Sequence, residues 1–190
     1  MKTIIILFII LFNLQSFVKA DDISDFEIEG MSIGDSALNF FSKNELNNAL
    51  EIFDYKDNKY RYYFLSFSKG KTYEALQITV KPEDKNFIIH GIDGNIAYEK
   101  NINDCYKKQK EIDKDLSNTF KNAERQFVSK SKHQADKSGK SNVTYVTYWF
   151  KSGDYVSIDC TDWSIQMSPR TDNLSVSLIT KELNDWLISD

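Results

Sequence analysis

Residues 142–160 read NVTYVTYWFKSGDYVSIDC, two runs of alternating apolar and polar residues around the turn residues Ser152-Gly153-Asp154. Successive side chains of a strand point to opposite faces of its sheet. The alternation therefore predicts strands at residues 142–151 and 155–160, joined as an antiparallel hairpin.

The same alternation recurs on both sides of this hairpin. It predicts a first hairpin, whose strands at residues 60–67 and 72–80 flank Lys69-Gly70-Lys71. A third strand is predicted at residues 87–92 and ends in a turn at Asp93-Gly94. Further strands are predicted at residues 25–30, 126–132 and 174–179. Proline occurs only at Pro82 and Pro169, so no proline-rich linker divides the chain.

Helical spacing marks four other segments. The longest predicted helix covers residues 103–123, where less polar side chains recur at helical intervals: Cys105, Ile112, Leu116 and Phe120. Short helices are predicted at residues 36–41, capped by Asp35, at 42–52, where Ser42 and Glu45 match a capping box, and at 181–187. This order predicts an α+β fold: antiparallel sheet or sheets of hairpins, an N-terminal helix pair, one long central helix and a short C-terminal helix.

The first twenty residues have the three parts of a secretory signal. Lys2 supplies a positive charge, residues 3–12 are apolar, and Val18-Lys19-Ala20 precedes the expected cleavage after Ala20. Polar residues from Asn13 onward leave the apolar run shorter than the roughly 20 residues of a membrane span. We therefore expect a periplasmic or secreted protein that is not stably inserted in a membrane after cleavage.

Residues 21–190 have the length and composition of a single exported α+β domain. A helix followed by a meander of strands occurs twice, which suggests two similar lobes at about residues 21–100 and 101–190. The net charge of −4 becomes more negative once Lys2 and Lys19 are removed. An acidic protein disfavours nucleic acid as a partner.

Cys105 and Cys160 are the only cysteines. An even cysteine count in an exported chain predicts a disulfide, and closing such a loop stabilises a fold by roughly 4 kcal/mol in the chain-entropy model. A redox-active pair is disfavoured, because the spacing is not Cys-x-x-Cys.

Candidate catalytic and metal-binding residues are few. His90 and His133 are the only histidines, and neither has neighbours at metal-ligand spacing, so we expect no metal. Gly139-Lys140-Ser141 matches the end of a phosphate-binding loop, but Gln134 replaces its first glycine and a strand pattern follows, so we expect no cofactor. The local pair of His133 and Asp136 is the catalytic candidate.

Aromatic residues gather on the predicted strands in two sets. They comprise Tyr60, Tyr62, Tyr63 and Phe64 in one half and Tyr145, Tyr148, Trp149, Phe150 and Tyr155 in the other. Alternation places part of each set outside the core, where aromatic rings can hold a partner. We expect Tyr62 and Tyr148 to point outward and to bind an envelope protein, a peptide or a glycan.

Residues 26–36, FEIEGMSIGDS, and the Phe40-Phe41-Ser42 that follows resemble a group of uncharacterised exported proteins from AT-rich marine bacteria. The step from Gly30-Met31-Ser32 into a helix pair is also similar to the start of the small outer-membrane assembly lipoproteins and of β-lactamase-inhibitor-like folds. The resemblance implies two helices on an antiparallel sheet. The chain lacks the lipid-bearing cysteine of those lipoproteins, so no functional residue carries over.

Three functions remain open at this point. The first is an exported, periplasmic, non-enzymatic binding or assembly protein that uses a sheet face or the helix pair. The second is an envelope hydrolase with His133 as base, Asp136 as orienter and an unassigned serine nucleophile. The third is a secreted inhibitor of a foreign enzyme. A hollow beside His133 would favour the hydrolase, and an open hairpin tip there would remove its site.

Overall fold

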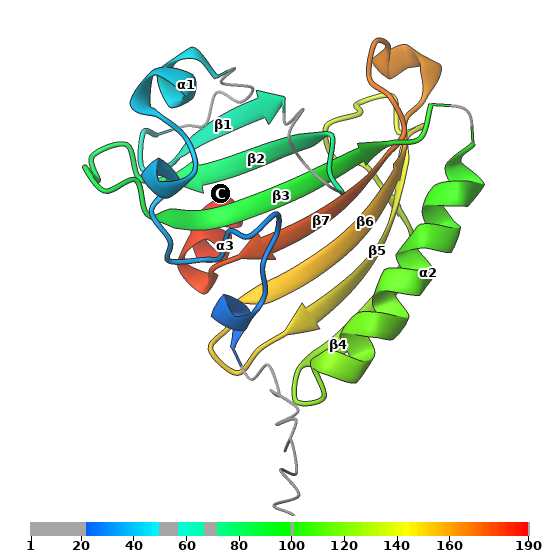
Figure 1. The fold of residues 1–190 in the computed structure, drawn as a ribbon. Coiled ribbons are helices and arrows are strands. Elements are labelled where there is room, and N and C mark those ends of the chain that lie inside the picture. Colours follow the sequence, from blue (N-terminus) through cyan, green and yellow to red (C-terminus); the bar gives the residue numbers. More distant parts are fainter. Residues whose placement is uncertain (1–21, 50–56, 67–71, 100, 190) are drawn as a thin grey trace, which may run out of the picture.

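The computed structural model describes residues 22–49, 57–66, 72–99 and 101–189. In this part of the chain, seven antiparallel strands form one sheet in the order β1-β2-β3-β7-β6-β5-β4 (Figure 1). The strands are β1 Arg61–Ser66, β2 Ala75–Val80, β3 Ile89–Ala97, β4 Glu124–Lys132, β5 Asn142–Trp149, β6 Tyr155–Asp162 and β7 Asn173–Ile179. The predicted combination of helices with an antiparallel sheet is confirmed.

Three α-helices accompany the sheet in the described residues: α1 Lys43–Asn48, α2 Ile102–Thr119 and α3 Lys181–Leu187. Short 3-10 helices lie at Ile23–Asp25, Ala37–Asn39 and Ile165–Met167. None of the helices in the described ranges is long and apolar enough to cross a membrane. The predicted signal segment and the hairpin turn at Lys69-Gly70-Lys71 lie outside the described residues.

β7 joins the two halves of the chain. It pairs with β3 on one side and with β6 on the other, so strands from both predicted lobes belong to one continuous sheet. Whether the two halves are a repeat stays a prediction.

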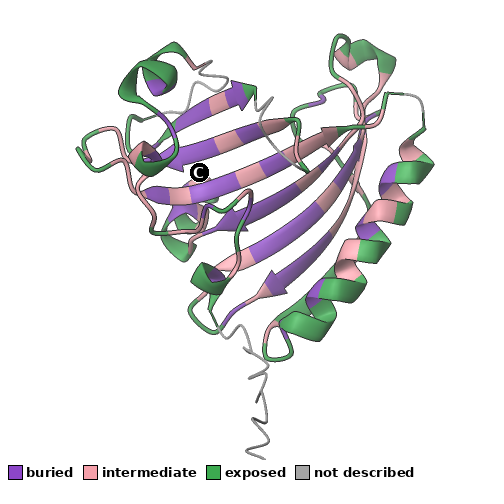
Figure 2. Cartoon of the chain, in the orientation of Figure 1, coloured by how far each residue is buried: buried purple, intermediate pink, exposed green. Residues whose placement is uncertain are grey.

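One face of the sheet carries the main core. α2 lies over β6 and β7 on this face, and the segment before β1 covers the part of the face that α2 leaves free (Figure 1). The buried strands and the outward-facing side of α2 are visible in Figure 2. Residues of the N-terminal segment and of the central strands share a single apolar cluster, which includes Ile28, Met31, Leu46, Ile92, Ile158, Val176 and Leu178.

The opposite face, which we call the open face, is covered only in part. α3 buries Leu183 and Trp186 against Tyr60, Tyr62 and Ile179. On this face, most of the remaining positions of β3, β6 and β7 carry serine, threonine, aspartate or asparagine. A polar surface therefore lies over the central strands.

The predicted turn at Asp93-Gly94 is wrong, because β3 continues through both residues to Ala97. Gly94 serves a different purpose. A Cβ atom at this position would lie 2.6 Å from the ring of Tyr73, so only glycine fits beneath that ring.

The predicted strand at residues 25–30 is also wrong. Ile28 and Met31 exchange backbone hydrogen bonds of 2.9 and 3.0 Å across a tight turn, in which Glu29 and Gly30 have positive φ. The helix predicted at residues 36–41 is only the short 3-10 turn Ala37–Asn39. Ser36 caps this turn, whereas Asp35 accepts a hydrogen bond from the Ser32 backbone N–H.

α1 begins with the predicted capping box of Ser42 and Glu45. Its last described turn ends at Asn48, and residues 50–52 of the longer helix that was predicted lie outside the described ranges.

Candidate binding groove on the open sheet face

Two rows of polar residues cross β3, β7 and β6 on the open face. Antiparallel pairing places Asp93 beside Ser177, and Ser177 beside Ser157. The next row contains Asn95, Ser175 and Asp159. Alternation along each strand turns the intervening apolar residues toward the core.

Each aspartate of these rows accepts a hydrogen bond from a serine hydroxyl. Ser177 donates to Asp93, and Ser157 donates to Asp159. Burial raises the pKa of Asp93 to about 6. Burial, with a smaller contribution from the charge of Asp93, raises the pKa of Asp159 to about 7. Both carboxyl groups therefore exchange protons near neutral pH.

Aromatic rings stand beside these carboxyl groups. The rings of Trp149 and Tyr155 lie 4.5 Å apart, measured between centroids. Burial raises the pKa of the Tyr155 hydroxyl, and the charges of Asp93 and Asp159 add to this shift.

The resulting hollow, which we call the open-face groove, has a volume of about 520 Å³. Its lining includes Tyr145, Thr147, Trp149, Tyr155, Ser157 and Asp159. It combines apolar ring surface with polar groups at fixed positions, which is typical of small-ligand sites.

His133 closes one end of the open-face groove. Its ring lies 4.2 Å from that of Trp163, and Arg170 lies 4.7 Å above the same Trp163 ring. Burial, together with the nearby charge of Arg170, lowers the pKa of His133. The sequence candidate His133 therefore lies beside a hollow, as a neutral imidazole at neutral pH.

Asp136 does not orient this histidine. Its carboxylate accepts hydrogen bonds from the Ser138 and Ser141 backbone N–H groups, each 2.8 Å, and from the hydroxyls of Ser141 and Ser164, at 2.7 and 2.9 Å. These hydrogen bonds hold the pKa of Asp136 well below its usual range. The Nδ1 atom of His133 instead accepts from the Ala135 backbone N–H. Asp136 thus organises the β4–β5 connection.

Tyr62 and Tyr148 do not point outward, contrary to the prediction. Tyr148 is 1 % exposed, because its ring packs under α2 in the main core. Tyr62 is 7 % exposed, because α3 covers it on the other face. These two rings therefore lie on opposite faces and form no common platform.

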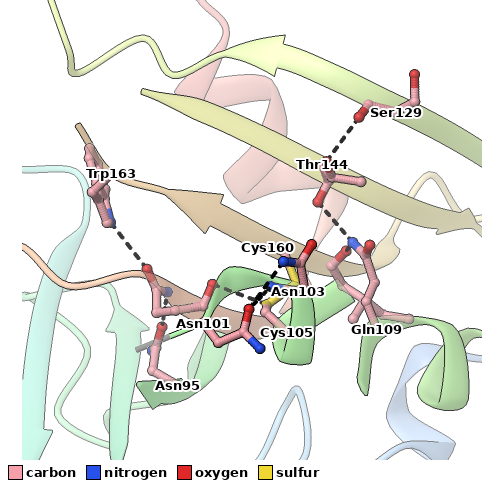
Figure 3. Close-up of a disulfide and its surroundings, with 11 residues drawn as sticks. Asn95, Asn101, Asn103, Cys105, Gln109, Ser129, Thr144, Cys160 and Trp163 are labelled. Atoms are coloured by element: carbon pink, nitrogen blue, oxygen red, sulfur yellow. Dashed lines mark hydrogen bonds between the residues drawn. A yellow bond between two sulfur atoms is a disulfide. The ribbon is translucent and has the colours of Figure 1, made fainter. Parts of the chain in front are cut away.

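The predicted disulfide between Cys105 and Cys160 is present, with the two Cα atoms 6.0 Å apart (Figure 3). It ties the first turn of α2 to β6. One turn later, Gln109 donates from Nε2 to the carbonyl oxygens of Thr144 and Ile158, at 2.8 and 2.7 Å. Both connections fix α2 on the core face, away from the open-face groove.

A second groove, of about 560 Å³, lies between α2 and β4. The main charged pair in this second groove consists of Arg125 and Asp113. These side chains already bind each other through two hydrogen bonds of 2.8 and 2.7 Å. We therefore place the candidate site in the open-face groove, where the carboxyl group of Asp159 has no basic partner within 4 Å among the described residues.

The described residues contain no cluster of three or more side chains suited to holding a metal ion. No family model matches the chain, and neither curated proteins nor solved structures yield a match. The resemblances to exported proteins of marine bacteria, assembly lipoproteins and β-lactamase-inhibitor-like folds stay predictions.

Sequence reasoning missed Asp93 and Asp159. Asp93 was assigned to a turn because it precedes a glycine. The sequence nevertheless indicates a polar face. The central strands place polar residues at every second position: Asp93 and Asn95, Ser157 and Asp159, Ser175 and Ser177. Central strands covered on both faces are apolar throughout, so this alternation indicates an uncovered face.

Proposed function

We propose that the protein is an exported, non-enzymatic binding protein that holds a small polar ligand in the open-face groove. The observation that carries this proposal is the carboxyl group of Asp159, which lines the hollow together with aromatic rings and hydroxyl groups and forms no ion pair among the described residues. Desolvating a carboxylate costs free energy unless a partner compensates. Groups with raised pKa values in a hollow are typical of functional sites.

Export belongs to the same proposal. The disulfide supports it, because such bonds persist mainly in oxidising compartments outside the cytosol. Mass spectrometry of the protein released by its own cells is expected to give an N-terminus at Asp21. Retention of residues 1–20 in that product would contradict the cleavage.

The binding proposal is tested by filling the groove. Thr161 lines the open-face groove and Ser129 lines the groove between α2 and β4, so Thr161→Trp and Ser129→Trp are matched substitutions. Native mass spectrometry of protein from its own exported fraction is expected to show the same bound small molecule on wild type and Ser129→Trp, and none on Thr161→Trp. Circular dichroism confirms that both variants are folded. Wild type without a bound molecule, or folded Thr161→Trp that retains it, would contradict the proposal.

A hydrolase is the second candidate, and two observations favour it: His133 lies beside the hollow, and so does Asp159. A carboxyl group with a pKa of about 7, such as Asp159, can hold a proton at neutral pH and deliver it to a leaving group. The two functions differ in the fate of the molecule in the groove. A hydrolase changes the mass of that molecule during incubation, and its Asp159→Asn variant leaves the mass unchanged. A binding protein releases the molecule intact.

A further inference from the structure

The groove of about 560 Å³ between α2 and β4, which we call the α2–β4 groove, has an apolar surface. Phe127 of the edge strand β4 is 51 % exposed and lines this groove together with Val146 and Tyr106. Small ligands bind most often in concave sites lined by apolar and aromatic side chains. The α2–β4 groove therefore qualifies as a second site, on the face of the sheet opposite to the open-face groove.

Most polar groups of the α2–β4 groove already have partners within the protein. Gln109 donates to two backbone carbonyl oxygens, and the Thr144 hydroxyl donates to the carbonyl oxygen of Ser129 at 2.9 Å (Figure 3). Arg125 and Asp113 bind each other. These groups are satisfied without a ligand, so they do not select a polar one.

Two lysines of the groove differ, because they lack an acidic partner. Lys110 and Lys130 both line the groove, and in the described part of the chain no carboxylate lies within 4 Å of either ammonium group. By contrast, Lys107 on the same helix binds Asp104 at 2.8 Å. The lining contains three basic side chains and one acidic one, whereas the whole chain has a net charge of −4.

The neighbouring residues explain why these two lysines stay unpaired. On a helix, residues three or four positions apart are neighbours. Asp113 is the carboxylate three residues after Lys110, but Arg125 already holds it. Beside Lys130, β4 pairs with β5, whose residues Asn142–Trp149 include no acidic side chain. Both ammonium groups are therefore available to a ligand.

The complement of this surface is an anion with an apolar body. A carboxylate accepts charge-assisted hydrogen bonds from ammonium groups. An alkyl chain leaves water when it lies against Phe127 and Val146, and the methylene stems of the lysines extend the same apolar surface. A cation would be repelled by the lysines, and a small polar molecule would leave the apolar surface uncovered.

We infer that the α2–β4 groove binds an aliphatic carboxylate of medium chain length, with its carboxylate at Lys110 and Lys130 and its alkyl chain against Phe127. This site is separate from the open-face groove and does not depend on the function proposed for that groove.

The test is equilibrium dialysis of the full chain at pH 8 against four probes: octanoate, octanol, octylamine and acetate. Octanoate is expected to bind most tightly, and octanol more weakly, because octanol shares only the alkyl chain. Acetate lacks the chain and octylamine carries a positive charge, so the protein is expected to retain neither. Octylamine or acetate retained as well as octanoate, or octanoate not retained at all, would overturn the inference.

Lys110→Met and Lys130→Met each remove one charge and keep an unbranched side chain. Each is expected to weaken octanoate about threefold and to leave octanol unchanged. Lys114→Met is the matched control, because Lys114 also lies on α2 but does not line the groove. This control is expected to bind octanoate like wild type. Equal weakening by Lys114→Met and Lys110→Met would show a general charge effect and would contradict the site.

Two substitutions that fill the grooves separate this inference from the proposed function. Ser129→Trp fills the α2–β4 groove and is expected to lose octanoate, whereas Thr161→Trp fills the open-face groove and is expected to keep it. Octanoate retained by folded Ser129→Trp would overturn the inference and leave the binding function of the open-face groove untouched.

An anionic membrane presents negative charge above an apolar layer, so vesicles are a necessary comparison. Wild type is expected to stay in the supernatant when vesicles of phosphatidylglycerol are sedimented. Sedimentation of wild type with the vesicles, abolished in Lys110→Met and kept in Lys114→Met, would assign the groove to a membrane surface and overturn the inference of a soluble ligand.

Discussion

Tyr148 on β5 donates its hydroxyl hydrogen to the carboxylate of Asp113 on α2, with 2.5 Å between the two oxygens. The same hydroxyl lies 2.8 Å from the backbone carbonyl oxygen of Asp113, and Arg125 of β4 donates to both carboxylate oxygens. One carboxylate thus joins the middle of α2 to both strands at this edge of the sheet.

Tyr148→Phe removes the hydroxyl and keeps the buried ring. A hydrogen bond to a charged group stabilises a fold by roughly 1.5–3 kcal/mol, and Arg125 retains part of the connection, so we expect a loss of roughly 1–2 kcal/mol in the free energy of unfolding. Urea denaturation measures this loss in the free energy of unfolding. Tyr145→Phe, on the same strand but the open face, is the control and is expected to stay within about 0.5 kcal/mol of wild type. Equal effects of the two substitutions would contradict the role of Asp113.

The disulfide is expected to contribute to stability through the unfolded chain. Cys105 and Cys160 are 55 residues apart, and removing such a bridge typically costs roughly 2–4 kcal/mol. We expect Cys105→Ser/Cys160→Ser to lower the free energy of unfolding by this amount, with a lower urea midpoint, and reduced wild type to match it. A reductant should leave the double variant unchanged. A midpoint that does not respond to the loss of the bridge would contradict the expectation.

Gly94→Ala should destabilise the protein although alanine is compatible with a strand. The added Cβ would lie 2.6 Å from the Tyr73 ring, whose backbone N–H is held by Glu29 at 3.0 Å. Overpacking of this kind costs roughly 1–3 kcal/mol. In a Tyr73→Ala background the same glycine substitution is expected to cost less, and thermal unfolding of the four proteins gives the coupling. Additive effects would show that the ring is not the obstacle.

The raised pKa values of Asp93 and Asp159 imply a definite dependence of stability on pH. In the unfolded chain aspartate titrates near 3.9, and in the folded protein these groups titrate near 6 and 7. Between about pH 4 and pH 7 the folded state therefore binds more protons, so the contribution of the pair to stability falls as pH rises through this window. His90 and His133, whose pKa values burial lowers, contribute the opposite slope.

The carboxyl contribution is the difference between wild type and Asp93→Asn/Asp159→Asn. From pH 5 to pH 8, wild type is expected to lose at least ~1 kcal/mol relative to the double variant in urea denaturation. Parallel pH profiles of the two proteins would show that these carboxyls are not desolvated.

Local patterns predicted much of this fold. Alternation predicted β1, β5, β6 and β7 to within a few residues, and helical spacing predicted α3 from Lys181 to Leu187. The prediction at Asp93-Gly94 failed because Asp-Gly favours a turn locally, whereas pairing with β2 and β7 continues β3 through both residues.

The location of the site depends on information that no single strand contains. Alternation shows that a strand has two different faces, but not which face a helix will cover. Tyr62 and Tyr148 illustrate the difficulty, since each lies beneath a different helix. Asp93, Ser177 and Ser157 become neighbours only when β7 enters between β3 and β6.

That position of β7 also determines when the fold can be completed. Until residues 173–179 are available, β3 and β6 each present an unpaired edge, and the two three-stranded halves of the sheet have no backbone contact through β7. Synthesis proceeds from the N-terminus, so β7 leaves the ribosome after the six other strands of the sheet. The chain is therefore expected to remain incompletely folded during synthesis, and a truncation before Asn173 would remove the middle of the sheet rather than its margin.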